Sequence, residues 1–429
     1  MSHDIQDHGL LRFATAGSVD DGKSTLIGRL LIDSKSLLGD HLSAIEAASR
    51  KRGLSQIDLS LLTDGLIAER EQGITIDVAY RYFATAARKF IIADSPGHAQ
   101  YTRNMVTAAS TADVAVLLVD ARKGLQSQTR RHAYLSSWVG IRRIVLAVNK
   151  IDLVGYSPQR FDEIDAEFRD FVAGLDFAQV QSIPMSALNG DMVVERGDAL
   201  SWYRGPTLLE YLETVPAHQD DDEQRPFRFA VQRVVRVPLG QAQPGSAYRD
   251  REFRGYQGTI ASGRIAVGDT VAALPSGLSA RVAELLVADR PVDVAFADEA
   301  VTIALDQDID VSRGDWFVAP DRRPRPQRAV DAEICWFDAE PLEPDRPYRI
   351  KHATQSVLAS FAPPAHRVDV ESLARVADPG TLAMNDIGRV RLNAQKPLPF
   401  EPYRDNRLTG SFIVIDEASN RTVAAGTVV

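Results

Sequence analysis

Hydrophobic positions gather in short blocks over the first half of the chain. Five short runs are rich in apolar residues, several of them apolar at every position, and longer stretches with helical periodicity separate them. Continuous apolar runs are typical of parallel strands that helices cover on both faces. From about residue 10 to residue 215, the pattern predicts a doubly wound, mostly parallel α/β domain. The predicted strands are Leu10–Ala16, Phe90–Ala93, Val114–Asp120, Ile144–Val148 and Val180–Met185.

One further segment of this half has a different pattern. Thr75–Phe83 alternates apolar and polar residues instead of being apolar throughout. Alternation is typical of a strand with one face in the core and one in solvent. We therefore expect an edge strand that pairs with Arg88–Ala93.

The pattern changes near residue 219. The acidic run Gln219–Glu223 lies between Pro216 and Pro226, which is typical of a linker, although a charged surface loop is the alternative. Beyond it, short β-rich segments alternate with Gly, Pro and Asp turns, which predicts a small antiparallel β-barrel. A second break, Pro320–Pro326, precedes another β-rich stretch. We expect a P-loop domain over 1–218, a first barrel over 225–320 and a second barrel over 327–429.

Composition narrows the class of protein. The 429 residues are 45% hydrophobic and 25% charged, with a formal net charge of −9, which disfavours a generally basic nucleic-acid-binding surface. Cys335 is the only cysteine, so we expect a buried core thiol and neither an internal disulfide nor a thiolate metal site. No apolar stretch suits a signal region or a membrane span, so we expect a cytoplasmic protein without a membrane partner.

The segment Gly17–Ser24 carries the strongest chemical signal. Two glycines, four residues between them, then Lys23 and Ser24, lie between a predicted strand and a predicted helix. Such a loop points backbone N–H groups at phosphate oxygens, and the helix N-terminus favours anions. Lys23 is expected to reach the β- and γ-phosphates, and Ser24 to ligate Mg²⁺; a glycine-rich turn before a structural helix is the alternative. The predicted nucleotide contacts here are Gly17, Ser18, Val19, Asp20, Asp21, Gly22, Lys23, Ser24 and Thr25.

A second motif, Asp94-Ser95-Pro96-Gly97, follows a predicted strand. Open α/β sheets bind ligands at that edge. Asp94 is expected to hold Mg²⁺ through a water, and the Gly97 N–H to sense the γ-phosphate. A simple Pro-Gly turn is the alternative for this short motif.

Two later motifs indicate the base. Asp152, in the run Asn149–Asp152, offers a carboxylate to the two N–H groups on the N1/N2 edge of guanine, a donor pair that adenine lacks. Lys150 is expected over the base plane and Asn149 at its Hoogsteen edge, although strand-end Asn and Asp are also common caps. The backbone of Ser186, Ala187 and Leu188 is expected to contact the guanine carbonyl oxygen. The order of the four motifs predicts GTP as the nucleotide.

The remaining candidates concern hydrolysis. Glu69–Ile76 is polar, contains Gly73 and precedes a strand, which suggests a switch segment whose Thr75 hydroxyl closes over Mg²⁺. A helix C-terminus capped near Gly73 is the alternative. His98 directly follows Gly97 and is expected to orient the attacking water. His98 and Lys23 are thus the candidate catalytic residues.

The chain resembles translation-factor-type GTPases over nearly its whole length. It is most similar to the family of large subunits of bacterial heterodimeric sulfate adenylyltransferase. The matching positions are Lys23, Ser24, Thr75, Asp94, Gly97, His98, Asn149, Lys150, Asp152 and Ser186. Further matching runs are Gly17–Leu31, Asp77–Phe83, Gln100–Met105, Asp120–Gly124, Gln128–His132, Trp202–Glu210, Gly255–Gly263 and Asp308–Asp315.

The resemblance implies a G domain followed by two β-barrels. It also implies that GTP hydrolysis drives a partner subunit of the ATP-pyrophosphatase type, which joins ATP and sulfate into adenosine 5′-phosphosulfate and pyrophosphate. Asp20 matches an acidic position that related factors place near a monovalent cation. Ala16 and Ala99 depart from the family pattern, where Cys and Glu are expected.

The sequence leaves other functions open. With no second phosphate loop, we expect no adenosine-phosphosulfate kinase activity, and adenylyl transfer is expected on another polypeptide. A translation factor that delivers tRNA is the principal alternative, although Asp21 stands where those factors usually carry His. A regulatory GTPase switch without metabolic coupling is the third possibility.

Overall fold

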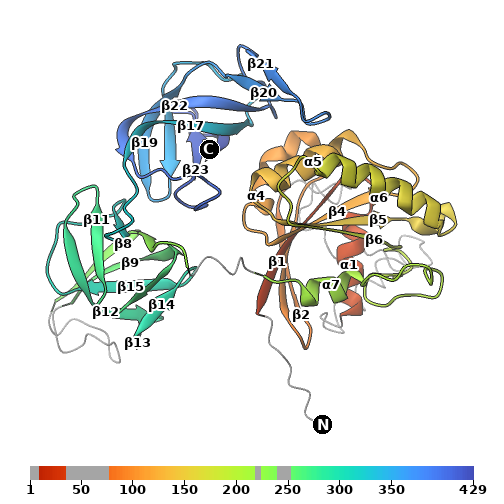
Figure 1. Cartoon of the computed structure of the whole chain (residues 1–429), viewed down its shortest axis with the longest axis horizontal. Helices are drawn as coiled ribbons and strands as arrows, with labels where there is room; N and C mark the ends of the chain where they lie inside the picture. Colours follow the sequence, from red (N-terminus) through yellow and green to blue (C-terminus); the bar gives the residue numbers. More distant parts are fainter. Residues whose placement is uncertain (1–8, 35–76, 218–223, 239–252) are drawn as a thin grey trace, which may run out of the picture. The chain divides into compact units, whose positions relative to one another are not determined.

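The computed structural model describes residues 9–34, 77–217, 224–238 and 253–429, and Figure 1 traces them. The chain divides into two units, each with its own core. The first unit is Met1–His218 with Asp369–Ala374, and the second is Gln219–Val368 with Arg375–Val429.

The first unit contains a six-stranded mixed sheet in the order β2-β3-β1-β4-β5-β6. All neighbours are parallel except the edge strand β2, which is antiparallel to β3, as its alternating sequence predicted. The central strand β4 is buried at every position, as expected of a strand covered on both faces. The strands are β1 Leu10–Gly17, β2 Ala79–Ala84, β3 Lys89–Asp94, β4 Val114–Asp120, β5 Arg143–Asn149 and β6 Gln179–Pro184.

Helices cover both faces of this sheet, with α4, α5 and α6 on one face and α1 and α7 on the other (Figure 1). Local capping sets where two of them begin: the Ser157 hydroxyl accepts from Arg160 N–H at 3.2 Å, and Thr207 and Glu210 form a capping box. In the described part of the chain, no helix has both the length and the apolar character to cross a bilayer. The helices are α1 Lys23–Asp33, α4 Thr102–Ala109, α5 Ser127–Trp138, α6 Pro158–Val172 and α7 Leu208–Thr214, with short 3₁₀ turns η2 Ala99–Tyr101 and η3 Ile151–Val154.

The second unit begins with a closed antiparallel β-barrel of six strands, β7-β9-β15-β12-β11-β16. Aromatic rings pack in its core, where the centroid of Phe317 lies 6.0 Å from that of Phe229 and 5.0 Å from that of Tyr256. The ring strands are β7 Arg228–Ala230, β9 Phe253–Ser262, β11 Thr270–Leu274, β12 Ser279–Val287, β15 Ala300–Leu305 and β16 Trp316–Val318. The strands outside the ring are β8 Arg233–Val237, β10 Arg264–Ala266, β13 Arg290–Val292 and β14 Val294–Phe296.

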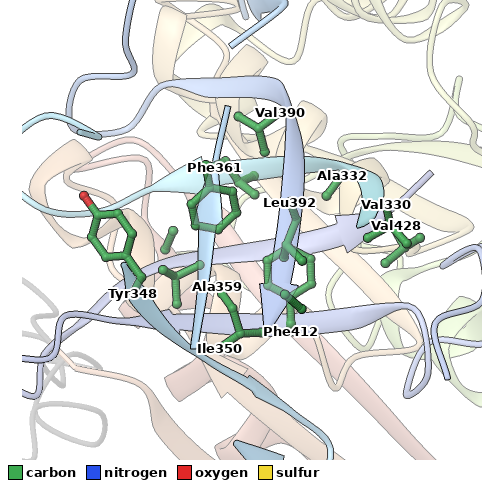
Figure 2. Packing of buried hydrophobic residues seen from close by; sticks show 14 of the residues in the cluster. Val330, Ala332, Tyr348, Ile350, Ala359, Phe361, Val390, Leu392, Phe412 and Val428 are labelled. Carbon is green, nitrogen blue, oxygen red and sulfur yellow. The ribbon is translucent and has the colours of Figure 1, made fainter. Parts of the chain in front are cut away.

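A second closed barrel of six antiparallel strands follows, in the order β17-β24-β23-β18-β19-β22. Figure 2 shows Phe361, Leu392 and Phe412 converging in its core. Cys335 is buried in β17, as predicted. The ring strands are β17 Gln327–Trp336, β18 Tyr348–His352, β19 Gln355–Phe361, β22 Ile387–Leu398, β23 Ser411–Ile415 and β24 Thr422–Val428, and the strands β20 His366–Val368 and β21 Arg375–Ala377 extend the sheet.

Polar side chains join the two barrels into one unit. The Arg228 guanidinium is buried and donates to both carboxylate oxygens of Glu401, at 2.9 and 2.8 Å. Asn406 Nδ2 donates to Ser262 Oγ at 2.8 Å in the same contact. A bidentate, buried Arg–carboxylate pair fixes orientation as well as distance. The predicted α/β GTPase domain followed by two barrels is therefore the observed fold class.

Candidate functional site

The phosphate loop joins β1 to α1, as the motif predicts. Gly22 adopts φ +96° at the helix N-terminus, and a Cβ there would lie 2.4 Å from Asn149 Nδ2. Both the backbone conformation and the close approach therefore require glycine. Val19, Ser24 and Thr25 are half-buried in and beside the loop.

Lys23 places its ammonium group inside the loop. Nζ donates to Gly17 O and Ser18 O, each at 3.1 Å, and the side chain is buried. Burial lowers the pKa of Lys23, while the carboxylates of Asp94 and Asp21 act in the opposite direction. The position favours the predicted contact with phosphate oxygens, which stays a prediction.

Asp21 stabilises the loop from within. Its Oδ2 accepts from the Ser18 N–H at 2.7 Å, and the side chain is buried. Burial raises the pKa of Asp21, whereas the Ser18 N–H bond and the nearby Lys23 oppose that rise. The sequence predicts Asp21 only as a nucleotide contact, and the structure adds a role in shaping the loop.

The second motif lies directly against the first. Asp94 is buried at the end of β3 and its Oδ1 accepts from Thr15 Oγ1 at 3.2 Å. A Cβ on Gly97 would lie 2.6 Å from both Gly17 O and Lys23 Nζ. The segment after β3 therefore packs on the phosphate loop so closely that only glycine fits, and the structure brings the two motifs together.

The chemistry of the residues present suits magnesium. Ser24 supplies a hydroxyl at the first turn of α1, and Asp94 a buried carboxylate, which are the hard oxygen ligands that Mg²⁺ prefers. Among the described residues there is no group of three or more His, Cys, Asp or Glu that could hold a metal. Phosphate oxygens and water would then supply most ligands, as is usual for Mg²⁺. Thr75, the third predicted ligand, lies outside the described residues.

Asn149 connects the base motif to the phosphate loop. Its Nδ2 donates to Asp21 O at 2.8 Å, and its Oδ1 accepts from Ala187 N–H at 2.9 Å. The side chain is buried between these partners. The amide therefore braces the site, and its predicted contact with the Hoogsteen edge of guanine stays a prediction.

Asp152 carries an acceptor without a protein partner. It lies in η3 directly after the Lys150 turn, and Oδ1 is buried yet accepts no hydrogen bond among the described residues. A buried carboxylate oxygen left in this state is costly unless a ligand donates to it. This favours the predicted recognition of the two donors on the guanine N1/N2 edge.

The guanine loop, residues Ser186, Ala187 and Leu188, follows β6. Ser186 and Ala187 are buried, whereas Leu188 is 52% exposed. The Ser186 Oγ accepts from Asn189 N–H at 3.3 Å, which closes a tight turn. The Ala187 N–H already donates to Asn149 Oδ1. The predicted backbone contact to guanine would therefore use another N–H of this loop.

His98 is exposed on the segment that follows Gly97. Its Nδ1 accepts from Gln100 N–H at 3.4 Å, and its ring lies edge-on to Tyr101 with centroids 6.2 Å apart. The predicted role in orienting water is compatible with this exposure and stays a prediction. The predicted switch segment Glu69–Ile76 lies outside the described residues.

Two family models match the chain. Residues 8–217 match the Elongation factor Tu GTP binding domain, and residues 329–429 match the GTP-eEF1A C-terminal domain-like family. The first match covers the sheet and the four motifs, and the second covers the second barrel.

Relatives cover almost all of this chain. A protein of Aeromonas salmonicida named "Sulfate adenylyltransferase subunit 1" is 47% identical over 429 residues, which span 100% of this chain and 88% of that protein. Its namesake in Bacteroides thetaiotaomicron is 48% identical over 431 residues, spanning 98% and 86%. The chain belongs to the sulfate adenylyltransferase subunit 1 family. The resemblance proposed from the motifs is thereby confirmed, in preference to a tRNA-delivering factor.

Longer proteins also match this member of the subunit 1 family. The "Bifunctional enzyme CysN/CysC" of Mycobacterium tuberculosis is 51% identical over 420 residues, which span 98% of this chain. The chain spans about two thirds of that bifunctional relative, with 67% of its length covered.

Asp120 is a site residue that the sequence analysis did not single out. It ends β4 opposite Asn149 of β5, and its Oδ2 lies 3.0 Å from Lys150 Nζ. The same ammonium group also donates to Asp20 O of the phosphate loop. Arg122 holds the carboxylate from the other side, with Nε 3.0 Å from Oδ1 and Nη2 2.6 Å from Oδ2. Asp120 therefore fixes the lysine that is expected over the base. The sequence could have indicated Asp120 as a site residue, because it is a charged residue at the end of a buried strand.

We expect the substitution Asp120→Asn to destabilise the G domain of this chain in a pH-dependent way. Burial alone would raise the pKa of Asp120, but the bonds from Arg122 and Lys150 hold it well below its usual range. A lowered folded-state pKa gives stability that is present above the unfolded pKa of about 3.9 and lost as pH falls through the folded pKa. Urea unfolding at pH 7 should show a loss of about 1.5–3 kcal/mol.

The matched control for this substitution is Asp162→Asn on α6, where the side chain is exposed. The gap between wild type and Asp120→Asn should narrow as the pH is lowered below about 4, because the Asp120 carboxylate of the unfolded state then takes up a proton while the folded state still resists protonation. A gap that stays constant with pH would contradict the ionic role of Asp120.

Proposed function

We propose that this chain binds GTP with Mg²⁺ and hydrolyses it to GDP and phosphate. The hydrolysis drives a partner catalytic subunit that converts ATP and sulfate into adenosine 5′-phosphosulfate and pyrophosphate. The single observation that carries the nucleotide part is the buried, unpartnered Asp152 Oδ1, in a site that Asn149 ties to the phosphate loop. Relatives 47–48% identical over nearly the whole chain bear the name of sulfate adenylyltransferase subunit 1, which supports the coupled reaction.

The residues of this chain divide the work of hydrolysis. Lys23 neutralises charge that develops on the phosphates, and the Gly97 N–H binds the γ-phosphate beside it. Ser24 and Asp94 would hold Mg²⁺, and the bound ion would supply charge neutralisation at the phosphate oxygens. His98 orients the attacking water. Thr75 completes the metal site when GTP is bound.

The partner performs adenylyl transfer. The sequence holds one GxxxxGK[ST] loop, and the base contacts that follow it select guanine rather than adenine. ATP and sulfate are therefore bound by the second subunit, which we assign to the ATP-pyrophosphatase type from the family resemblance. We also propose a cytoplasmic location for the complex.

Coupling requires that the GTP and GDP states differ in their affinity for the states of the partner. A nucleotide that bound both states equally would shift nothing. The buried Asn149 amide links the phosphate loop to the guanine loop, so both ends of a bound nucleotide contact one connected part of the G domain. We propose that the G domain presents the GTP state to the partner.

The test is a reconstitution of the full chain with the candidate catalytic subunit. Production of GDP and of adenosine 5′-phosphosulfate is measured while partner, ATP and sulfate are added in turn. We expect GTP hydrolysis to rise only when all three are present, with pyrophosphate released in parallel.

Two results would redirect the proposal. GTP hydrolysis indifferent to partner, ATP and sulfate would leave a GTPase without metabolic coupling. GTP-dependent retention of aminoacyl-tRNA in a gel shift at low salt would favour the tRNA-delivery function instead.

A further inference from the structure

Arg29 reaches from the phosphate-binding helix to the guanine loop. It lies in α1, and its Nε donates to Ala187 O at 3.2 Å while its Nη2 donates to Leu188 O. Asp33, one turn further along α1, lies 3.6 Å from the same guanidinium. None of the sequence motifs includes this contact, which joins segments 158 residues apart.

The two carbonyl bonds determine where one N–H points. Ala187 C=O and Leu188 N–H belong to the same planar trans peptide, so they point in opposite directions. Holding the Ala187 oxygen against Arg29 therefore aims the Leu188 N–H away from α1. A guanidinium presents several donors in a fixed fork, which suits two successive carbonyls.

Leu188 supplies the one uncommitted donor of the turn. The Ala187 N–H donates to Asn149 Oδ1, and the Asn189 N–H donates to Ser186 Oγ. Among the described residues, the Leu188 N–H donates to no protein acceptor. Leu188 is 52% exposed, so the turn that carries this donor is not covered over by the rest of the domain.

We propose that Arg29 is a positioning residue for guanine recognition, which aims the Leu188 N–H at the 6-oxo oxygen of the base. Arg29 does not touch the nucleotide in this arrangement. It acts by fixing the peptide between Ala187 and Leu188, and it ties base recognition to the helix whose N-terminus binds phosphate. The inference rests on the proposed GTP site.

The test compares nucleotides that differ at one edge of the base. 6-thio-GDP retains the N1–H and 2-amino donors but replaces the 6-oxo oxygen by sulfur, a weaker acceptor. IDP keeps the 6-oxo oxygen and lacks the 2-amino donor. Equilibrium affinities of GDP, 6-thio-GDP and IDP are measured for wild type and Arg29→Met, a substitution that retains much of the side-chain volume without the charge.

We expect wild type to prefer GDP over 6-thio-GDP by about 3- to 10-fold, the worth of one hydrogen bond. Arg29→Met should bring that ratio towards one, while the GDP-to-IDP ratio, which reports on Asp152, stays unchanged. A merely structural role would instead weaken all three nucleotides by one factor and leave both ratios intact. That result would overturn the inference.

The matched control is Arg169→Met on α6. Arg169 forms the same type of one-turn helical pair, with Asp165 at 2.9 Å, away from the guanine loop. It should leave both ratios at their wild-type values. Asp33→Asn weakens the hold on Arg29 without removing it, and it should also reduce the preference for GDP over 6-thio-GDP. This variant tests the inference if Arg29→Met does not fold. If wild type itself fails to bind GDP, the proposed function fails; if GDP binds and no Arg29 or Asp33 variant changes the ratio, only this inference fails.

Discussion

Asp152→Asn is expected to exchange the base preference of the site from guanine to xanthine. The carboxylate accepts from two donors, the N1–H and the 2-amino group of guanine. An asparagine offers one acceptor and one donor, which match the N1–H and the 2-oxo oxygen of xanthine. Because two hydrogen bonds to a charged group are lost, GDP affinity should fall by about 10²- to 10⁴-fold while XDP affinity rises.

The measurement is competition of GDP and XDP for the purified chain, followed by hydrolysis of GTP and XTP. Asp162→Asn on α6 removes the same charge from an exposed position and should leave the preference unchanged. If Asp152→Asn keeps the full GDP affinity, the base binds elsewhere, and the unpartnered Asp152 Oδ1 does not accept from guanine.

Lys23→Ala is expected to stop GTP turnover and, with it, GTP-stimulated sulfate activation. Nζ lies inside the phosphate loop beside Gly97, and no other cation is held by the carbonyls of Gly17 and Ser18 in the described residues. Loss of one preorganised charge at a transferring group costs about 10²- to 10³-fold in kcat. The hydrolysis rate and the yield of adenosine 5′-phosphosulfate should fall together.

Lys89→Ala is the comparison, since Lys89 is an exposed lysine at the start of β3. It should retain both activities. GTP-stimulated synthesis that persisted in Lys23→Ala would break the link between hydrolysis and adenylyl transfer. Folding of the variant is checked by urea unfolding, because burial already disfavours the charged form of Lys23 and its removal need not be destabilising.

Local pattern predicted the sheet and the motifs well. β4 is buried at all its positions and apolar up to its last residue, Asp120, and the alternating β2 is the antiparallel edge strand. Lys23, Asp94 and Gly97 meet because the ends of parallel strands share one edge of a sheet. That argument needs only the order of strands and motifs, both of which are visible in the sequence.

Contacts between distant side chains were beyond the sequence. Asp120 and Arg29 were not predicted as site residues, because their partners are chosen by strand register and helix orientation rather than by neighbouring residues. Closure of the barrels has the same origin: the β17–β22 pair joins residues about sixty apart, and no local signal specifies it. The expected domain boundaries and the assigned site residues remain predictions.

The Asn149 amide affects how tightly a ligand binds when it contacts the base site and the phosphate site together. One side chain contacts the phosphate loop through Asp21 O and the guanine loop through Ala187 N–H. The base site and the phosphate site are therefore held at a fixed spacing by one side chain. A nucleotide gains affinity from this fixed spacing, because binding of one end raises the effective concentration of the other end at its own site. An inhibitor that links a guanine mimic to a diphosphate mimic would gain the same affinity only if its linker keeps the spacing set by this one amide.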